Sequence, residues 1–330
     1  MKLIRSKAEL IEPLGFDLGS IKKTIELAAR TCYKSEANIT ETSAEKMYNN
    51  LIERGHTAML EHAPVYLYHY GETNLEKYAE NKYSIYYSVY DHKVVVEDGN
   101  DVDYDYYYKE YVTTNMRVIL ENGWLSDLKY LSEPKEAHMR VIMMRFTTDR
   151  GVSHELVRHR TFSFAQESTR YCNYSKDKYG ESITYIIPSW LPDLPEGDVE
   201  YQNDFPVVKT DTGIYKCSEL ETVFINQLKS AEDCYMDLVT KWEDRKPDRR
   251  YKTGYKSNPL TPQQARQVLP NALKTEIVLT APLHYWKHFF DLRYFGTTGS
   301  PHPDMLELTT KAVEVLKKHD LWPEKFSSNR

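Results

Sequence analysis

Apolar residues recur every three or four positions in several parts of the chain, which is the spacing of one helix face. Between Ser20 and Tyr33, the residues Ile21, Ile25 and Ala28 fall on such a face. The same spacing predicts further helices over residues 42–54, 152–159, 218–245, 282–293 and 303–318. Thr261-Pro262 is suited to the start of another helix, with Thr as the cap and Pro in the first turn. Because the 218–245 segment has the longest apolar stripe, we expect a core helix or a subunit interface there.

Runs of strand length predict β-structure in three places, Val65–Tyr70, Arg140–Phe146 and Ile183–Ile187. Residues 81–111 are rich in tyrosine, with a short predicted strand at Lys93–Glu97 and a turn sequence at Asp98–Asp101. We therefore expect a hairpin in this part of the chain. Residues 188–213 contain four prolines and several acidic residues, and they are predicted to be loop.

The order of these elements lacks the regular strand–helix–strand alternation of a parallel sheet. It favours an α+β fold, with a mixed or antiparallel sheet flanked by helices. We interpret residues 1–330 as a single domain with insertions near residues 81–135 and 188–213. The strand at Arg140–Phe146, a turn at Asp149–Gly151 and the helix at 152–159 lead directly into the chemically richest segment, residues 158–170.

Composition and charge exclude several classes of protein. Hydrophobic residues make up 41% and charged residues 28%, as in an ordinary globular protein. The net charge of −6 argues against a broad nucleic-acid surface, and no apolar run reaches the ~20 residues of a membrane helix. The four cysteines form no Cys-x-x-Cys pair and the N-terminus has no signal-peptide pattern, so we expect a cytoplasmic protein. The 27 tyrosines favour half-buried strands and subunit interfaces, which suggests an oligomer.

The sequence contains neither of the glycine-rich motifs that cradle phosphates, and it has only 13 glycines. Any bound nucleotide must therefore be held by side chains. The best candidate is the segment Arg158–Arg170, which combines three arginines, a histidine and four hydroxyl groups. Arginine binds phosphate in a bidentate manner and stays charged, so this composition suits a phosphorylated ligand. An exposed, salt-bridged helix end would have a similar composition.

The spacing inside this segment resembles a known family. Arg158-His159-Arg160, seven residues and then Ser168 match the Arg-His-Arg-x7-Ser motif of the flavin-dependent thymidylate synthases. Further segments resemble the same family in the same order, namely residues 29–33, 56–62 (His-Thr-Ala-Met-Leu-Glu-His), 266–270 (Arg-Gln-Val-Leu-Pro) and 292–293 (Leu-Arg). The resemblance thus extends over most of the chain.

The resemblance implies the family's fold, a homotetramer with sites shared between subunits, and methylation of dUMP to dTMP. It further implies FAD as cofactor, with methylenetetrahydrofolate and NADPH as co-substrates, and no metal. The residues it places at dUMP are Glu155, Arg158, Gln166, Glu167, Ser168, Thr169, Arg170, Arg266 and Arg293. Those it places at FAD are His56, Ala58, Glu61, Arg158, His159, Arg160, Gln166, His284 and His288. Arg293 would be catalytic, because a fixed cation facing N3 of the uracil favours its ionised form.

The sequence departs from the family pattern at four positions, Ala58, Glu155, Pro282 and His288. Glu155 stands where relatives often have Gln, and an acid beside a dianionic phosphate is unfavourable, so we expect it to contact the uracil or the ribose. Pro282 and His288 stand where relatives often place Asn against the flavin, and Pro has no N–H to donate. Ala58 replaces a residue that usually carries a hydroxyl group.

Three other interpretations compete with this one. His154-Glu155 followed by His159 resembles a zinc motif, but positions i and i+5 point about 140° apart on a helix, so both rings cannot reach one ion. A nucleic-acid-binding module would use the arginines, but the acidic net charge argues against it. Ser168 or Cys172 could serve as a nucleophile, although neither has an evident activating base. We interpret Ser168 as a dUMP ligand and Cys172 as structural.

Overall fold

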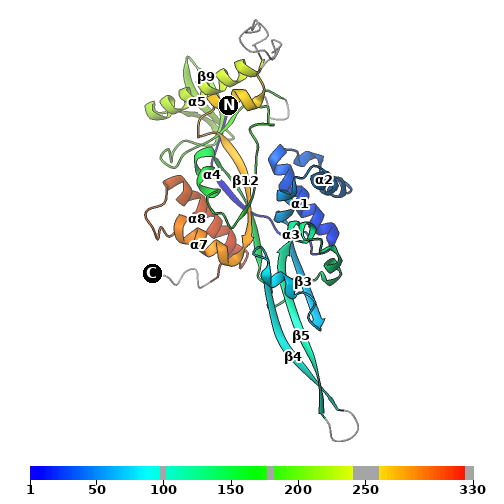
Figure 1. The fold of residues 1–330 in the computed structure, drawn as a ribbon. Helices are drawn as coiled ribbons and strands as arrows, with labels where there is room; N and C mark the ends of the chain where they lie inside the picture. Colours follow the sequence, from blue (N-terminus) through cyan, green and yellow to red (C-terminus); the bar gives the residue numbers. More distant parts are fainter. Residues whose placement is uncertain (97–101, 177–181, 241–259, 324–330) are drawn as a thin grey trace.

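The computed structural model describes residues 1–96, 102–176, 182–240 and 260–323, with the main chain alone for 92–96 and 102–106. It is elongated, and three sheets follow one another along its length (Figure 1). The helices pack around these sheets, and strands pair in both parallel and antiparallel directions. The α+β class predicted from the sequence is therefore confirmed.

The central sheet has the order β2-β6-β12-β7, in which every pair is antiparallel. Its strands are β2 (Lys7–Leu10), β6 (Val141–Asp149), β7 (Ser163–Gln166) and β12 (Lys274–Pro282). Helices α4 (Arg150–Leu156), α7 (Leu283–Arg293) and α8 (Pro303–Lys318) share an apolar core with β6 and β12. The buried apolar side chains of this core hold the sheet together. The sheet in turn positions both ends of the segment Arg158–Arg170, called the motif segment below.

The second sheet has the order β11-β10-β9-β1-β8, in which β1 and β8 are parallel. Its strands are β1 (Lys2–Ile4), β8 (Thr184–Ile186), β9 (Gly197–Gln202), β10 (Phe205–Thr210) and β11 (Gly213–Lys216). Helix α5 (Glu219–Thr240) shares an apolar core with this sheet.

The prediction that residues 188–213 form a loop is wrong, because β9, β10 and the start of β11 lie there. Asn203 and Asp204 adopt positive φ angles of 50° and 68°, which suits a two-residue hairpin turn. Pro206 pairs with Tyr201 of β9 and lies beyond the last pair between β10 and β11, so its missing N–H costs no ladder hydrogen bond.

The third sheet, β3-β5-β4, is antiparallel and contains the predicted hairpin. Strands β4 (Ile85–Val96) and β5 (Val102–Asn115) form the two arms, and β3 (Pro64–Gly71) lies beside β5. The predicted turn at Asp98–Asp101 lies outside the described residues. Helices α1 (Leu18–Tyr33), α2 (Ser43–Glu53) and α3 (Met116–Glu121) and the 3-10 turn η2 (Thr57–His62) share an apolar core with this sheet.

The predicted strands 65–70, 140–146 and 183–187 and all of the long helices within the described residues are confirmed within a few residues. Asp149 is not part of a turn but ends β6 and caps α4, since its carboxylate accepts from the Val152 N–H at 2.9 Å. The helix at Thr261 is one turn, α6 (Pro262–Ala265), and Arg266 opens the following 3-10 turn η7 (Arg266–Val268). Residues 241–245 of the predicted 218–245 helix lie outside the described part.

Candidate active site

The motif segment runs along one edge of the central sheet. Arg158, His159 and Arg160 follow the end of α4, β7 pairs with β12, and residues 167–170 continue beyond β7. Arg158 and Arg160 are exposed, whereas the His159 ring is buried. The segment therefore presents two guanidinium groups to the surface and anchors itself through the histidine between them.

Arg293, at the end of α7, is held by two residues of the motif region. Its Nη1 lies 2.6 Å from Oε2 of Glu155, and its Nε donates to Nε2 of His159 at 3.1 Å. A second guanidinium nitrogen donates to the Glu155 carbonyl oxygen at 3.3 Å. Three contacts fix the plane of the guanidinium, so the predicted dUMP residues Glu155 and Arg293 are brought together with His159.

His159 is neutral in this arrangement. Burial, the nearby Arg293 charge and His288 together lower the pKa of His159 to about 4. A neutral ring has an unprotonated nitrogen, and this is the acceptor that the Arg293 Nε–H requires. The ring also packs edge-to-face against Phe289, with centroids 4.9 Å apart. The buried His159 ring thus helps to position the Arg293 guanidinium.

A second group of cations lies at the other end of the segment. Arg266 donates to Oγ1 of Thr169 at 3.0 Å, and Arg170 donates to the Gln263 side chain at 3.2 Å. Ser168 is partly buried, its N–H donates to the Cys32 carbonyl at 3.0 Å, and its hydroxyl accepts from the Arg170 N–H at 3.3 Å. The Arg170 and Arg266 side chains are exposed, so positive charge is concentrated at the surface near Ser168.

Two further residues predicted at dUMP, Glu167 and Gln166, make side-chain contacts within the chain. The Glu167 carboxylate is buried and lies 2.9 Å from Lys274 Nζ, which also bonds Glu276 at 2.6 Å. The Gln166 amide donates to Ser153 at 2.9 Å and to Thr275 at 3.3 Å. These contacts tie the end of β7 to β12 and α4, and they set the position of Ser168.

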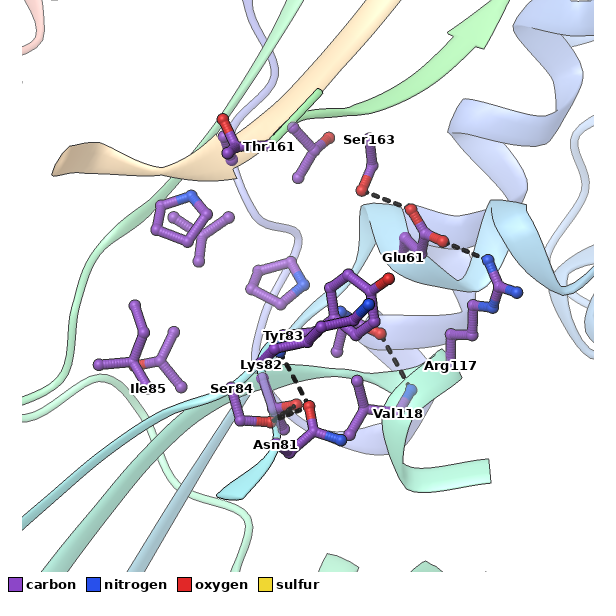
Figure 2. Close-up of a pocket in the computed structure, with 18 of the residues that line it drawn as sticks. Glu61, Asn81, Lys82, Tyr83, Ser84, Ile85, Arg117, Val118, Thr161 and Ser163 are labelled. Carbon is purple, nitrogen blue, oxygen red and sulfur yellow. Dashed lines mark hydrogen bonds and ion pairs between the residues drawn. The ribbon is translucent and has the colours of Figure 1, made fainter. Parts of the chain in front are cut away.

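A cavity of about 700 Å³ opens between η2, α3, the foot of the β4–β5 hairpin and the segment after Arg160 (Figure 2). In its wall, Glu61 accepts from the Ser163 hydroxyl at 2.7 Å and pairs with Arg117 at 2.5 Å. Figure 2 shows Glu61 between these two partners. Of the residues predicted at FAD, Glu61 and Arg160 line this cavity. His56, Ala58, His284 and His288 lie on the surface.

The sequence reasoning missed Arg117 and the residues Asn81–Ile85, which line the same cavity. Both lie in the segment 81–135, which we interpreted as an insertion, and neither belongs to a recognisable sequence motif. The register of β4 on β5, which pairs Ile85 with Thr113, brings this stretch to the cavity.

Two further findings bear on the competing interpretations, and a third concerns membrane-spanning helices. Cys172 is fully buried in the apolar core around Tyr185 and Tyr235. His154 is exposed while His159 is buried, and within the described residues no group of three or more His, Cys, Asp or Glu side chains could hold a metal ion. No helix in the described part of the chain is both long and apolar enough to span a membrane.

The chain is similar to known proteins over much of its length. A family model described as thymidylate synthase complementing protein matches residues 121–320. A protein from Mycolicibacterium vanbaalenii, named flavin-dependent thymidylate synthase, is 32% identical over 179 residues, covering 54% of this chain and 57% of the relative. A protein of the same name from Mycolicibacterium gilvum is 29% identical over 205 residues, covering 62% and 64%. The match thus spans less than two thirds of the length of these relatives.

Among solved structures, a UMP/dUMP methylase PolB from Streptomyces cacaoi bound with 5-Br UMP aligns over 96% of this chain and 92% of its own. Its identity of 13% and TM-score of 0.38 are too low to support any argument. The family match does not depend on it, because it covers more than half of the chain and includes the whole Arg158–Arg170 segment together with Arg266 and Arg293. The chain therefore belongs to the family of thymidylate synthase complementing proteins, the flavin-dependent thymidylate synthases.

Proposed function

We propose that the protein converts dUMP to dTMP, taking the one-carbon unit from methylenetetrahydrofolate, with FAD as cofactor and NADPH as reductant. The observation that carries this proposal is the oriented Arg293, held by Glu155 and His159 beside a complete Arg-His-Arg-x7-Ser motif. This arrangement sits inside the part of the chain that matches the family. The cytoplasmic location expected from the sequence is part of the same proposal.

For dUMP, the exposed arginines would neutralise the phosphate and Arg293 would face the uracil. Arg170 and Arg266 are held by Gln263 and Thr169 respectively, so their charges are partly oriented before a ligand arrives. Arg293 would stabilise negative charge on the uracil, because a fixed cation in a partly buried site favours the ionised form of a neighbouring group. Glu155, already bonded to Arg293, would lie on the uracil or ribose side.

For FAD, the 700 Å³ cavity fits the size range of cofactor pockets. Arg160 and Lys82 in its wall would hold the diphosphate, and Phe162 and Tyr285 offer flat apolar surface. Glu61 is anchored by Ser163 and Arg117 and would fix the orientation of a polar ring edge. Reduced FAD supplies a hydride when it is bound.

The proposal includes a homotetramer with sites shared between subunits. Arg158, Arg160, Arg170 and Arg266 are all exposed in a single chain. A symmetric assembly that brings a second chain over these residues would exclude water from them and strengthen their charge interactions.

The test is formation of dTMP by the purified full chain supplied with dUMP, methylenetetrahydrofolate, FAD and NADPH. Arg158→Ala should abolish most turnover. Arg54→Ala is a matched control, because Arg54 is also an exposed arginine at a helix end and has no assigned contact with dUMP or FAD. No dTMP from the wild-type protein, or an equal loss in both variants, would refute the proposal.

A further inference from the structure

A tight turn directly before strand β4 forms part of the wall of the 700 Å³ cavity. The Ser84 N–H donates to the Asn81 carbonyl oxygen at 3.0 Å, which closes a four-residue turn. The Asn81 side chain fixes it further, because Oδ1 accepts from the Tyr83 N–H at 2.9 Å and from the Ser84 hydroxyl at 3.3 Å. The Ser84 hydroxyl also lies 2.8 Å from Oγ1 of Thr114 on β5. Lys82 and Tyr83 are thus held at the two central positions of a turn that is attached to the sheet.

The ring of Tyr83 is little used by the fold. It is 65% exposed, more than any other tyrosine whose side chain the structure describes. Within the described chain its ring contact is with the ammonium group of Lys82, 4.8 Å from the ring centroid. Figure 2 shows the two side chains lying together between Asn81 and Glu61. A flat, exposed ring in the wall of a cavity is suited to stacking on an aromatic ligand.

The charges of the cavity wall favour an anion. Its two carboxylates, Glu61 and Glu121, both pair with Arg117. Its other two cations, Lys82 and Arg160, are exposed and form no salt bridge with a described residue. The charges that remain without an ionic partner in the described part of the wall are therefore both positive, and such groups bind phosphate. A ligand with an aromatic base next to phosphate groups, as in a nucleotide, matches this combination.

The position of the turn indicates which half of FAD it meets. The wall on the side of the central sheet contributes Phe162, Pro282 and Tyr285, and helix α7, which begins after Pro282, ends at Arg293. The flavin ring has to reach a uracil held at Arg293, so we assign that ring to the α7 side. The turn belongs to the third sheet, and Figure 2 shows it across the cavity from Thr161. The half of FAD that is remote from the flavin ring therefore lies at the turn.

We propose that Lys82 and Tyr83 bind the adenosine diphosphate half of FAD, and that this turn makes the site select FAD over FMN. The adenine stacks on the Tyr83 ring, while Lys82 and Arg160 pair with the diphosphate. FMN carries the same flavin ring and one phosphate but no adenosine, so it cannot use Tyr83. This inference rests on the proposed function, which assigns FAD to the cavity.

Calorimetric titration of the purified full chain, stripped of any bound flavin, with FAD, FMN and ADP tests the proposal. Removing an aromatic ring that stacks on a base weakens binding by about 10-fold or more. Tyr83→Ala should therefore raise the Kd of FAD and of ADP by about 10-fold and leave the Kd of FMN unchanged. Tyr83→Phe keeps the ring and should bind FAD like the wild type. Tyr87→Ala is the matched control, because Tyr87 is also an exposed tyrosine near the start of β4 but does not line the cavity.

The outcomes separate this inference from the proposed function. Tyr83-dependent binding of ADP and FAD by a protein that makes no dTMP would support the turn and refute the proposed function alone. Equal losses of FAD and FMN affinity in Tyr83→Ala, or an unchanged Kd for FAD, would overturn the inference. A raised KM for NADPH with an unchanged Kd for FAD would assign the turn to the reductant and overturn it too. If Tyr83→Ala does not fold, the wild-type chain decides, since FMN that binds as tightly as FAD contradicts the selection.

Discussion

Removing the Lys274 side chain should destabilise the protein strongly, because it leaves a buried carboxylate without its cation. Glu167 is 3% exposed and its carboxylate pairs with Lys274 Nζ, whereas Arg150, among the described residues, contacts only the Glu167 main-chain oxygen. Glu276 shares Lys274 but keeps a second partner, Lys34, at 2.6 Å. In Lys274→Met the methionine fills most of the lysine volume, so the change in stability reports mainly the loss of the positive charge. The uncompensated group is therefore Glu167.

Breaking a buried ion pair by removing one partner costs about 3–5 kcal/mol. For a chain of 330 residues, an unfolding entropy of about 2 cal/mol/K per residue converts this to a fall in Tm of about 4–7 °C. The double variant Lys274→Met/Glu167→Gln removes both charges, and it should recover most of that loss.

Urea and thermal unfolding of the two single variants and the double variant at pH 7 measure this coupling. We expect Lys274→Met to be less stable than the double variant. If the double variant is as unstable as Lys274→Met, the cost comes from lost packing and the charge argument is wrong. Glu167→Gln alone should change stability more than the KM for dUMP, since its carboxylate points into this network.

Three further predictions concern single residues. Arg293→Ala should lower kcat by about 10²-fold or more with a small change in Tm, and wild-type turnover of this variant would remove its assigned role. Cys172→Ala should keep most of the activity, whereas complete loss in a folded variant would make the thiol a reacting group. Burial lowers the pKa of His62 to about 4, from 6.5 in the unfolded chain, so the unfolded state binds the extra proton and stability should fall as pH drops from 6.5 towards 4. His62→Gln should flatten this decline in urea unfolding at pH 7 and pH 5, and an unchanged slope would contradict the assignment.

Much of the architecture was predictable because it depends on local periodicity. The stripe around Ile21 and Ile25 lies on the buried face of α1, and the apolar faces of α7 and α8 are buried as well. In α5 the predicted stripe is buried at Leu228, Ala231, Tyr235 and Val239, whereas Leu220 and Val223 near the start of the helix are exposed. Such patterns predict the structure well because an amphipathic helix packs with its apolar face against the core.

The predictions failed where tertiary pairing decides the outcome. Residues 274–282 form the central strand β12, yet no strand was predicted there, since a short apolar run followed by a helix gives no alternation. The meander at 197–216 was hidden by its prolines and acids, although the Asn203–Asp204 turn was a usable signal.

The candidate site was predictable to the extent that it resides in one segment. The association of Arg293 with Glu155 and His159 joins residues up to 138 positions apart, and only the resemblance to a family pointed to it. Arg117 and Asn81–Ile85 reach the cavity through strand register, which single-sequence reasoning does not determine.

The visible absorption spectrum of the purified full chain shows whether this protein binds a flavin and dUMP together. We expect a bound-flavin spectrum, either as purified or after adding FAD, that shifts when dUMP is titrated in. The shift should disappear in Arg266→Ala, while Arg54→Ala retains it. A protein that remains colourless after adding FAD and shows no response to dUMP would contradict the proposed function.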